Sequence, residues 1–287
     1  MPYLYLIMTI FFNASASIIC SFYNRKNKDK ENPTPFYNFL LLVSIFACWV
    51  ILFLFDRTLD WKVVPYAILF SIGFTTAIFS LIQALKTGPV LLTSLILQLS
   101  LIGATVWGFF FWGTKFTWGV GVGLALVVVS LLLCLYTGKR EEQKLNPRWL
   151  FFVAILFLGN AFCTIIQKNQ QVEFNGQYGN FMMMLATGIG CFVIAMYYLK
   201  SKRTESRELL KKSWYFPVVA GALNAFQNLL VILLATTSLS PSLIYPVLSI
   251  GSLMVTTVFS AFIFKEKMCW WQWLGIAIGI IAIGILS

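Results

Sequence analysis

The chain has 287 residues, of which 59% are hydrophobic and only 11% are charged. Soluble domains carry about 25% charged residues, so this composition excludes a soluble globular protein and predicts an integral membrane protein. The formal net charge of +11 does not indicate a nucleic-acid partner, because the basic residues stand between apolar segments. There they orient the protein and meet lipid headgroups.

Ten apolar segments follow one another along the chain, each long enough to span a hydrocarbon core of about 30 Å. The predicted spans are 3–23, 36–55, 63–85, 89–112, 117–136, 149–168, 179–199, 214–236, 240–264 and 270–286. No Lys or Arg precedes the first segment, so we interpret it as a retained transmembrane helix rather than a signal peptide.

The connections between the spans share the basic residues unequally. Odd-numbered connections hold 17 of the 21 Lys and Arg residues. Cytoplasmic loops of membrane proteins carry the excess of Lys and Arg. We therefore expect the odd-numbered connections to be cytoplasmic and both termini to be extracytoplasmic.

The second half of the chain repeats features of the first. An offset of 152 residues aligns Pro65, Pro89, Trp118 and Gly123 with Pro217, Pro241, Trp270 and Gly275. Each half has five spans, an odd number, so the second half enters the membrane in the opposite orientation. The predicted fold is an all-α integral membrane protein of ten transmembrane helices in two inverted five-helix repeats, 1–137 and 149–287, joined by a cytoplasmic linker at 138–148. Inverted repeats are typical of secondary transporters.

Polar side chains inside the predicted spans are candidates for substrate binding, because they are costly in hydrocarbon unless they face a partner or a cavity. Several lie three or four residues apart and so share one helical face. The predicted substrate-binding residues are Asn13, Ser17, Gln83, Gln98, Asn160, Thr164, Asn224, Gln227, Asn228 and Tyr245. We expect them to line a central cavity between spans 1, 3, 4, 6, 8 and 9. The alternative is that these groups join helices to one another, and Ser and Thr also bond their own backbone cheaply.

The residue types missing from the spans restrict the chemistry. No Asp, Glu, Lys or Arg lies clearly within a predicted span, and the chain contains no His. This favours neutral, zwitterionic or amphiphilic substrates. It also disfavours a membrane-embedded enzyme, because no nucleophile stands near a recognisable base. We expect no catalytic residue, no metal site and no cofactor.

Glycines four residues apart occur in the fifth and tenth spans, at Gly119 and Gly123 and at Gly275 and Gly279. Small residues at this spacing permit close helix contact. We expect these two spans to be structural and to pack within the chain or in a dimer.

Short motifs stand at the ends of the predicted halves: ALKTGP at 84–89, SP at 240–241, YP at 245–246 and FKEK at 264–267. With the two half-repeats, they resemble the drug/metabolite transporter superfamily, specifically its ten-helix EamA-like family. The resemblance implies a transporter of amino acids, related metabolites, sugars or toxic organic compounds. From the resemblance and the distribution of basic residues we expect a multi-pass protein of the plasma (inner) membrane. We also expect a monomer or homodimer.

The halves depart from each other within these motifs. The first half has Thr114 where the second has Glu266, and Ser94 where the second has Pro246. The membrane-embedded glutamate that small multidrug-resistance relatives use for proton coupling has no counterpart in the first span. This absence favours facilitated transport or exchange.

The leading hypothesis is a transmembrane transporter of small metabolites, amino acids or related neutral or zwitterionic compounds. It would act by efflux or exchange, with alternating access around the central polar cavity, and its partners would be the substrate and membrane lipids. The alternative is a flippase for a lipid or lipid-linked carrier, which needs a groove open to the bilayer. A sensor or scaffold would not account for inverted repeats.

Overall fold

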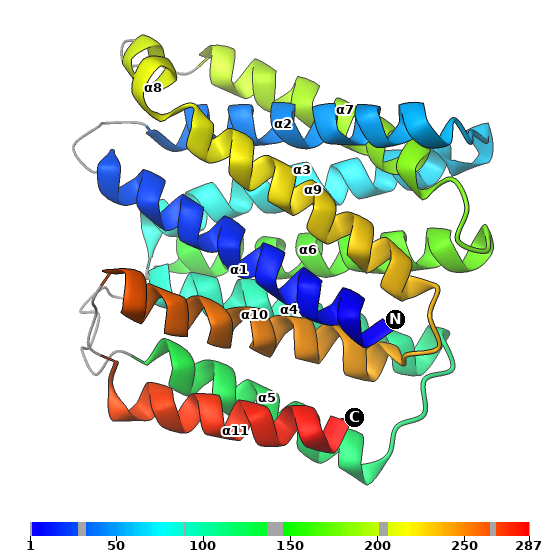
Figure 1. Ribbon diagram of the computed structural model, residues 1–287, viewed down its shortest axis with the longest axis vertical. Helices are drawn as coiled ribbons and strands as arrows, with labels where there is room; N and C mark the ends of the chain where they lie inside the picture. Colours follow the sequence, from blue (N-terminus) through cyan, green and yellow to red (C-terminus); the bar gives the residue numbers. More distant parts are fainter. Residues whose placement is uncertain are drawn as a thin grey trace. The chain divides into compact units, whose positions relative to one another are not determined.

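The computed structural model describes residues 2–27, 33–88, 90–136, 146–200, 206–264 and 268–286, and every regular element in these ranges is helical (Figure 1). The elements are α1 (Pro2–Lys26), α2 (Pro33–Asp56), the 3₁₀ turn η1 (Trp61–Val63), α3 (Val64–Thr87), α4 (Val90–Phe111), α5 (Trp118–Leu135), α6 (Pro147–Glu173), α7 (Gly179–Lys200), α8 (Ser206–Ser213), α9 (Tyr215–Ala235), α10 (Pro241–Phe264) and α11 (Trp270–Leu286). Residues 265–267 of the FKEK motif and most of the predicted linker lie outside the described residues.

Nine of the described helices are long and apolar enough to cross a membrane, so the chain is a multi-pass membrane protein. The tenth predicted span corresponds to α11, which is apolar but has 17 residues. That length is at the lower end of the range of about 17–25 residues for a transmembrane helix. The predicted all-α class is confirmed for the described part of the chain.

Two elements differ from the sequence prediction. Helix α8 lies in a stretch that we expected to be a loop; its buried Leu209 and its terminal Lys211 and Lys212 suit a short helix on a polar surface. Helix α6 runs on to Glu173, beyond the predicted end at residue 168. Polar residues extend α6 because their side chains are buried within the fold, as described below.

The helices group into two compact units. Apart from the first two residues, unit 1 comprises residues 3–75 and 166–236, and unit 2 comprises residues 76–165 and 237–287. Each unit therefore takes helices from both predicted halves. The halves are defined by sequence repetition and stay a prediction.

In unit 1, α2 packs against α7 and α9. Helix α2 approaches α9 closely at Gly221, where an added Cβ would lie 2.6 Å from the backbone oxygen of Leu41 and 2.7 Å from the Cβ of Ser44. The Oγ of Ser44 donates a hydrogen bond to the backbone oxygen of Val218 at 2.7 Å. Glycine is required here because the two helix backbones nearly touch.

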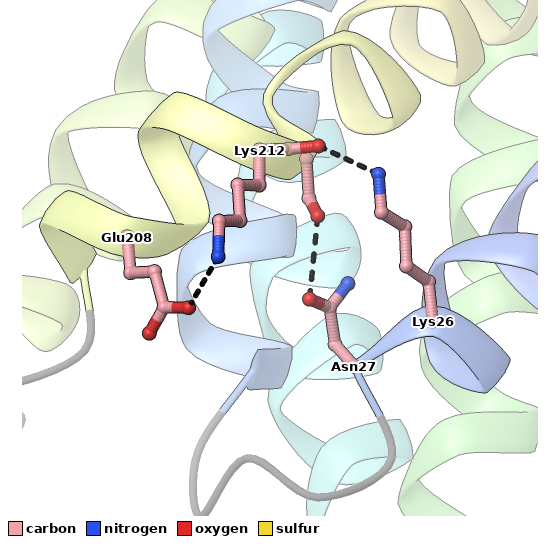
Figure 2. A network of polar contacts seen from close by, with 5 residues as sticks. Lys26, Asn27, Glu208 and Lys212 are labelled. Atoms are coloured by element: carbon pink, nitrogen blue, oxygen red, sulfur yellow. Dashed lines mark hydrogen bonds and ion pairs between the residues drawn. The ribbon is translucent and has the colours of Figure 1, made fainter.

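The C-terminal end of α1 is tied to the junction of α8 and α9, also within unit 1 (Figure 2). The Nζ of Lys26 donates to the backbone oxygen of Lys212 at 2.8 Å, and the Oγ of Ser213 donates to the Oδ1 of Asn27 at 3.3 Å. Lys212 also pairs with Glu208 at 3.1 Å inside α8. These contacts satisfy polar groups at helix ends, which have no partner within their own helix.

In unit 2, α5 and α11 lie side by side (Figure 1). The Oγ of Ser130 donates to the backbone oxygen of Gly275 at 2.5 Å. The Nε2 of Gln272 donates to the backbone oxygen of Cys134 at 3.2 Å. Both bonds use backbone carbonyls inside apolar helices, so they fix the register of this pair.

The glycine spacing noted in the sequence produces this contact. Added Cβ atoms at Gly123, Gly275 and Gly279 would each lie 2.7 Å from a neighbouring residue. The expected close packing is thus confirmed within the chain for these three glycines. Gly119 takes no part, because its nearest neighbour is Thr117 Oγ1 at 3.9 Å.

Helix α10 packs against α4 in the same unit. The Oγ of Ser249 donates to the backbone oxygen of Gln98 at 2.9 Å, and the Oγ1 of Thr105 donates to that of Pro241 at 3.4 Å. Hydroxyl groups from both helices therefore tie α4 and α10 together.

Candidate functional site

The polar face of α9, in unit 1, holds three of the predicted residues one helical turn apart. The Nδ2 of Asn228 donates to the backbone oxygen of Asn224 at 2.9 Å and to its Oδ1 at 3.1 Å. The Oε1 of Gln227 is buried and has no hydrogen-bond partner among the described residues. An unpaired buried acceptor is costly, so Gln227 offers a place for a donor from a bound molecule.

Helix α1 supplies the other two predicted residues of unit 1. The Oγ of Ser17 donates to the backbone oxygen of Asn13 at 3.0 Å. Phe12 of α1 and Phe226 of α9 meet with ring centroids 6.3 Å apart, and they adjoin Asn13 and Gln227 in sequence. The fold thus brings α1 and α9 together at the level of these two amides.

In unit 2, Asn160 of α6 contacts α4. Its Nδ2 donates to the Oγ of Ser100 at 2.6 Å, and Ser100 is fully buried. The Oγ1 of Thr164 donates to the backbone oxygen of Asn160 at 3.2 Å. Part of the Asn160 amide is therefore used in joining helices, which is the alternative that the sequence left open.

The remaining predicted residues are also in unit 2, and among the described residues no hydrogen bond links their side chains to this pair. Gln83 and Gln98 are half-buried, and their side-chain amides make no hydrogen bond within the described part of the chain. Tyr245 is buried, and its ring centroid lies 6.2 Å from that of Trp112.

The ten predicted residues differ in whether their side-chain polar atoms already have a hydrogen-bond partner in the protein. Ser17, Thr164 and Asn228 donate within their own helices. The side-chain amides of Asn13, Gln83 and Gln98 have no partner among the described residues, and neither has the Oε1 of Gln227. Each unit, taken by itself, therefore has side-chain amide atoms that can form hydrogen bonds with a small molecule.

The predicted site leaves out a group of polar residues at the C-terminal end of α6, in unit 1. Gln167, Lys168, Gln170 and Gln171 are all buried. The expectation that no charged residue lies within a span is therefore wrong for Lys168, whose helix continues to Glu173. The run of five polar residues at 167–171, directly after an apolar segment, was a signal that could have revealed this group.

Comparison with known proteins relates the second half of the chain to a family. A family model described as the EamA-like transporter family matches residues 147–287. No curated protein matches the chain. A solved structure described only as "Crystal structure of protein" is similar over 100% of this chain and 96% of its own, with a TM-score of 0.75 and 13% sequence identity. At this identity the likeness shows the fold alone.

Proposed function

Since residues 147–287 belong to the EamA-like transporter family, we propose that this multi-pass membrane protein is a carrier for small neutral or zwitterionic metabolites, such as amino acids and related compounds. The family consists of membrane transporters of small molecules rather than enzymes. The observation that carries the substrate proposal is the buried Oε1 of Gln227, an acceptor without a partner among the described residues.

The carrier acts by alternating access between two inverted five-helix repeats. Helix packing supports this proposal. In unit 1, α2 packs against α7, and in unit 2, α4 packs against α10 and α5 against α11. These pairs are the second, fourth and fifth spans of the two predicted halves. Packing of equivalent helices is what a two-fold relation between inverted repeats produces.

The substrate is held by amides and not by a carboxylate. In unit 1, Gln227 accepts a hydrogen bond from the substrate, and the side-chain amide of Asn13 donates or accepts as the substrate requires. In unit 2, taken by itself, the side-chain amides of Gln83 and Gln98 offer the same kinds of donor and acceptor. Asn224 in unit 1 and Asn160 in unit 2 each have side-chain amide atoms that their own helix contacts do not use. The remaining residues of the predicted set hold these helices in position.

Transport is efflux or exchange across the plasma (inner) membrane, with both termini extracytoplasmic. An epitope tag at the C-terminus should then be accessible to antibody in intact cells or spheroplasts. A tag that becomes accessible only after permeabilisation would contradict this orientation. Chemical cross-linking in the same membranes would show whether the protein is a monomer or a homodimer.

Thermal unfolding of the detergent-purified protein tests the substrate proposal. The panel comprises amino acids, sugars, nucleosides, organic cations and lipids. A ligand present at 100 times its Kd stabilises the folded state by about 2.7 kcal/mol, which is a measurable rise in Tm. A hit among the soluble metabolites should also drive counterflow in proteoliposomes. Stabilisation by lipids alone would contradict the metabolite carrier and favour a flippase.

A further inference from the structure

Lys168 is a buried cation inside a membrane-spanning helix. Its side chain is 8% exposed, and α6 spans Pro147–Glu173 with Asn160 at its midpoint. At 1.5 Å per residue, Lys168 lies about 12 Å along the helix axis from that midpoint, within the half-thickness of about 15 Å of a hydrocarbon core. Lysines near helix ends usually extend to the membrane surface. Lys168 instead turns its ammonium into the protein.

The ammonium has one hydrogen-bond acceptor in the described part of the chain. The Nζ of Lys168 donates to the backbone oxygen of Ala235, the last residue of α9. This carbonyl has no partner within its own helix, and the helix C-terminus carries partial negative charge. An ammonium has three N–H donors, so this bond leaves two. The ion pair seen among the described residues joins Lys212 to Glu208 and does not involve Lys168.

Two neighbouring side chains also hold polar atoms without partners. The Nε2 of Gln167 and the Oε1 of Gln171 are buried, and neither has a hydrogen-bond partner among the described residues. Gln167 and Gln171 are 4% and 1% exposed, respectively. Gln171 follows Gln167 by four residues and Lys168 by three, so all three belong to one surface of α6.

A purely structural role does not account for this cluster. The bond to the backbone oxygen of Ala235 uses one of the three donors of the ammonium. With this bond made, the Lys168 ammonium still has unused N–H donors. The buried Gln167 Nε2 and Gln171 Oε1 still have no partner among the described residues. Such groups are expensive in a membrane unless something binds them. Donors next to an acceptor suit a molecule with both an anionic group and an N–H.

We propose that Lys168, Gln167 and Gln171 form a binding site for a compound that has a carboxylate next to an amino group. The Lys168 ammonium and the Gln167 Nε2 donate to the carboxylate, and the Gln171 Oε1 accepts from the amino group. This inference rests on the proposed function and narrows the substrate class to zwitterions of the amino-acid type. It also gives the carrier the fixed counter-ion that the sequence analysis did not find.

The test compares amino acids with their carboxamides. Thermal unfolding is measured with each of the twenty L-amino acids and with the carboxamide of each one that binds. In the wild-type protein, the acid should raise the Tm and the carboxamide should bind at least tenfold more weakly. Lys168→Gln should abolish this preference, whereas Lys168→Arg should keep most of it. The exposed Lys62 provides the matched control, and Lys62→Gln should behave as the wild type.

Further variants separate binding from folding. Should Lys168→Gln not fold, Gln167→Leu keeps the charge and should weaken binding of the acid several-fold while leaving the carboxamide unchanged. Equal binding of acid and carboxamide by the wild type, or an unchanged preference in Lys168→Gln, would overturn the proposal. Stabilisation by sugars, nucleosides or organic cations alone would overturn this inference and leave the carrier function standing. If no compound in the panel raises the Tm, the result would contradict both the proposed carrier function and the binding site at Lys168.

Discussion

The side-chain Nδ2 of Asn160 in α6 donates a hydrogen bond of 2.6 Å to the Oγ of Ser100 in α4. The Oγ of Ser100 itself donates to the backbone oxygen of Leu97 at 2.5 Å. Ser100 is thus saturated as a donor and serves as an acceptor for the asparagine. The asparagine amide still has a second N–H and its oxygen, so the same residue can join two helices and bind a substrate.

Asn160→Ala and Ser100→Ala separate these two roles. Both remove the same hydrogen bond, and each should lower stability by about 1 kcal/mol. Asn160→Ala should also reduce counterflow per folded protein at least tenfold, because it removes the whole amide. Ser100→Ala keeps the amide and should transport at near-normal rates. Equal transport by the two variants would show that Asn160 is only a helix-joining residue.

Gln227→Leu should abolish transport without lowering the stability of the protein. The substitution removes a buried acceptor that has no protein partner, and leaving such an acceptor unpaired costs about 1–3 kcal/mol. We therefore expect an unchanged or higher Tm together with loss of counterflow. Gln177→Leu, at an exposed position outside the spans, controls for the substitution itself. Normal transport by Gln227→Leu would remove the residue from the site.

Gly275→Ala should destabilise unit 2. The new Cβ would lie 2.7 Å from the backbone nitrogen of Cys134 and 2.9 Å from its sulfur, and overpacking of this kind costs about 1–3 kcal/mol. Gly284→Ala, in the same helix, is the matched control because nothing lies within 4 Å of its added Cβ. Unfolding midpoints of the two variants in detergent give the comparison. Similar midpoints for the two variants would mean that the contact between α5 and α11 accommodates the added methyl group without loss of stability.

Asn27→Ala should weaken the attachment of α1 to the junction of α8 and α9 seen in Figure 2. The change leaves the fully buried Ser213 hydroxyl without its acceptor and removes the 2.9 Å bond from Asn27 Nδ2 to the backbone oxygen of Tyr23. We expect a loss of about 1–3 kcal/mol and faster proteolysis near residue 27. Asn24→Ala, exposed on the same helix, should have little effect. A wild-type proteolysis pattern in Asn27→Ala would argue against a fastening role.

The sequence by itself determined which segments cross the membrane and where two helices approach closely. Hydropathy is a sum over contiguous residues, so spans are readable without knowing what they contact. The spacing that predicted close packing of Gly275 and Gly279 is equally local, because residues four apart always share a helical face. Polar spacing likewise placed Asn224, Gln227 and Asn228 together on one face of α9.

Only the tertiary structure decided what each polar group does. Asn160 and Ser100 are 60 residues apart, and Lys168 reaches a carbonyl 67 residues away, so no local pattern identifies either partner. The predicted sixth span ends at Lys168, because a polar run normally marks a loop. The fold keeps that run helical and buries it, since the end of α9 and the chain at Gln177 supply acceptors there. A polar residue in a membrane is stable wherever a partner meets it, and partners are set by packing rather than by sequence neighbours.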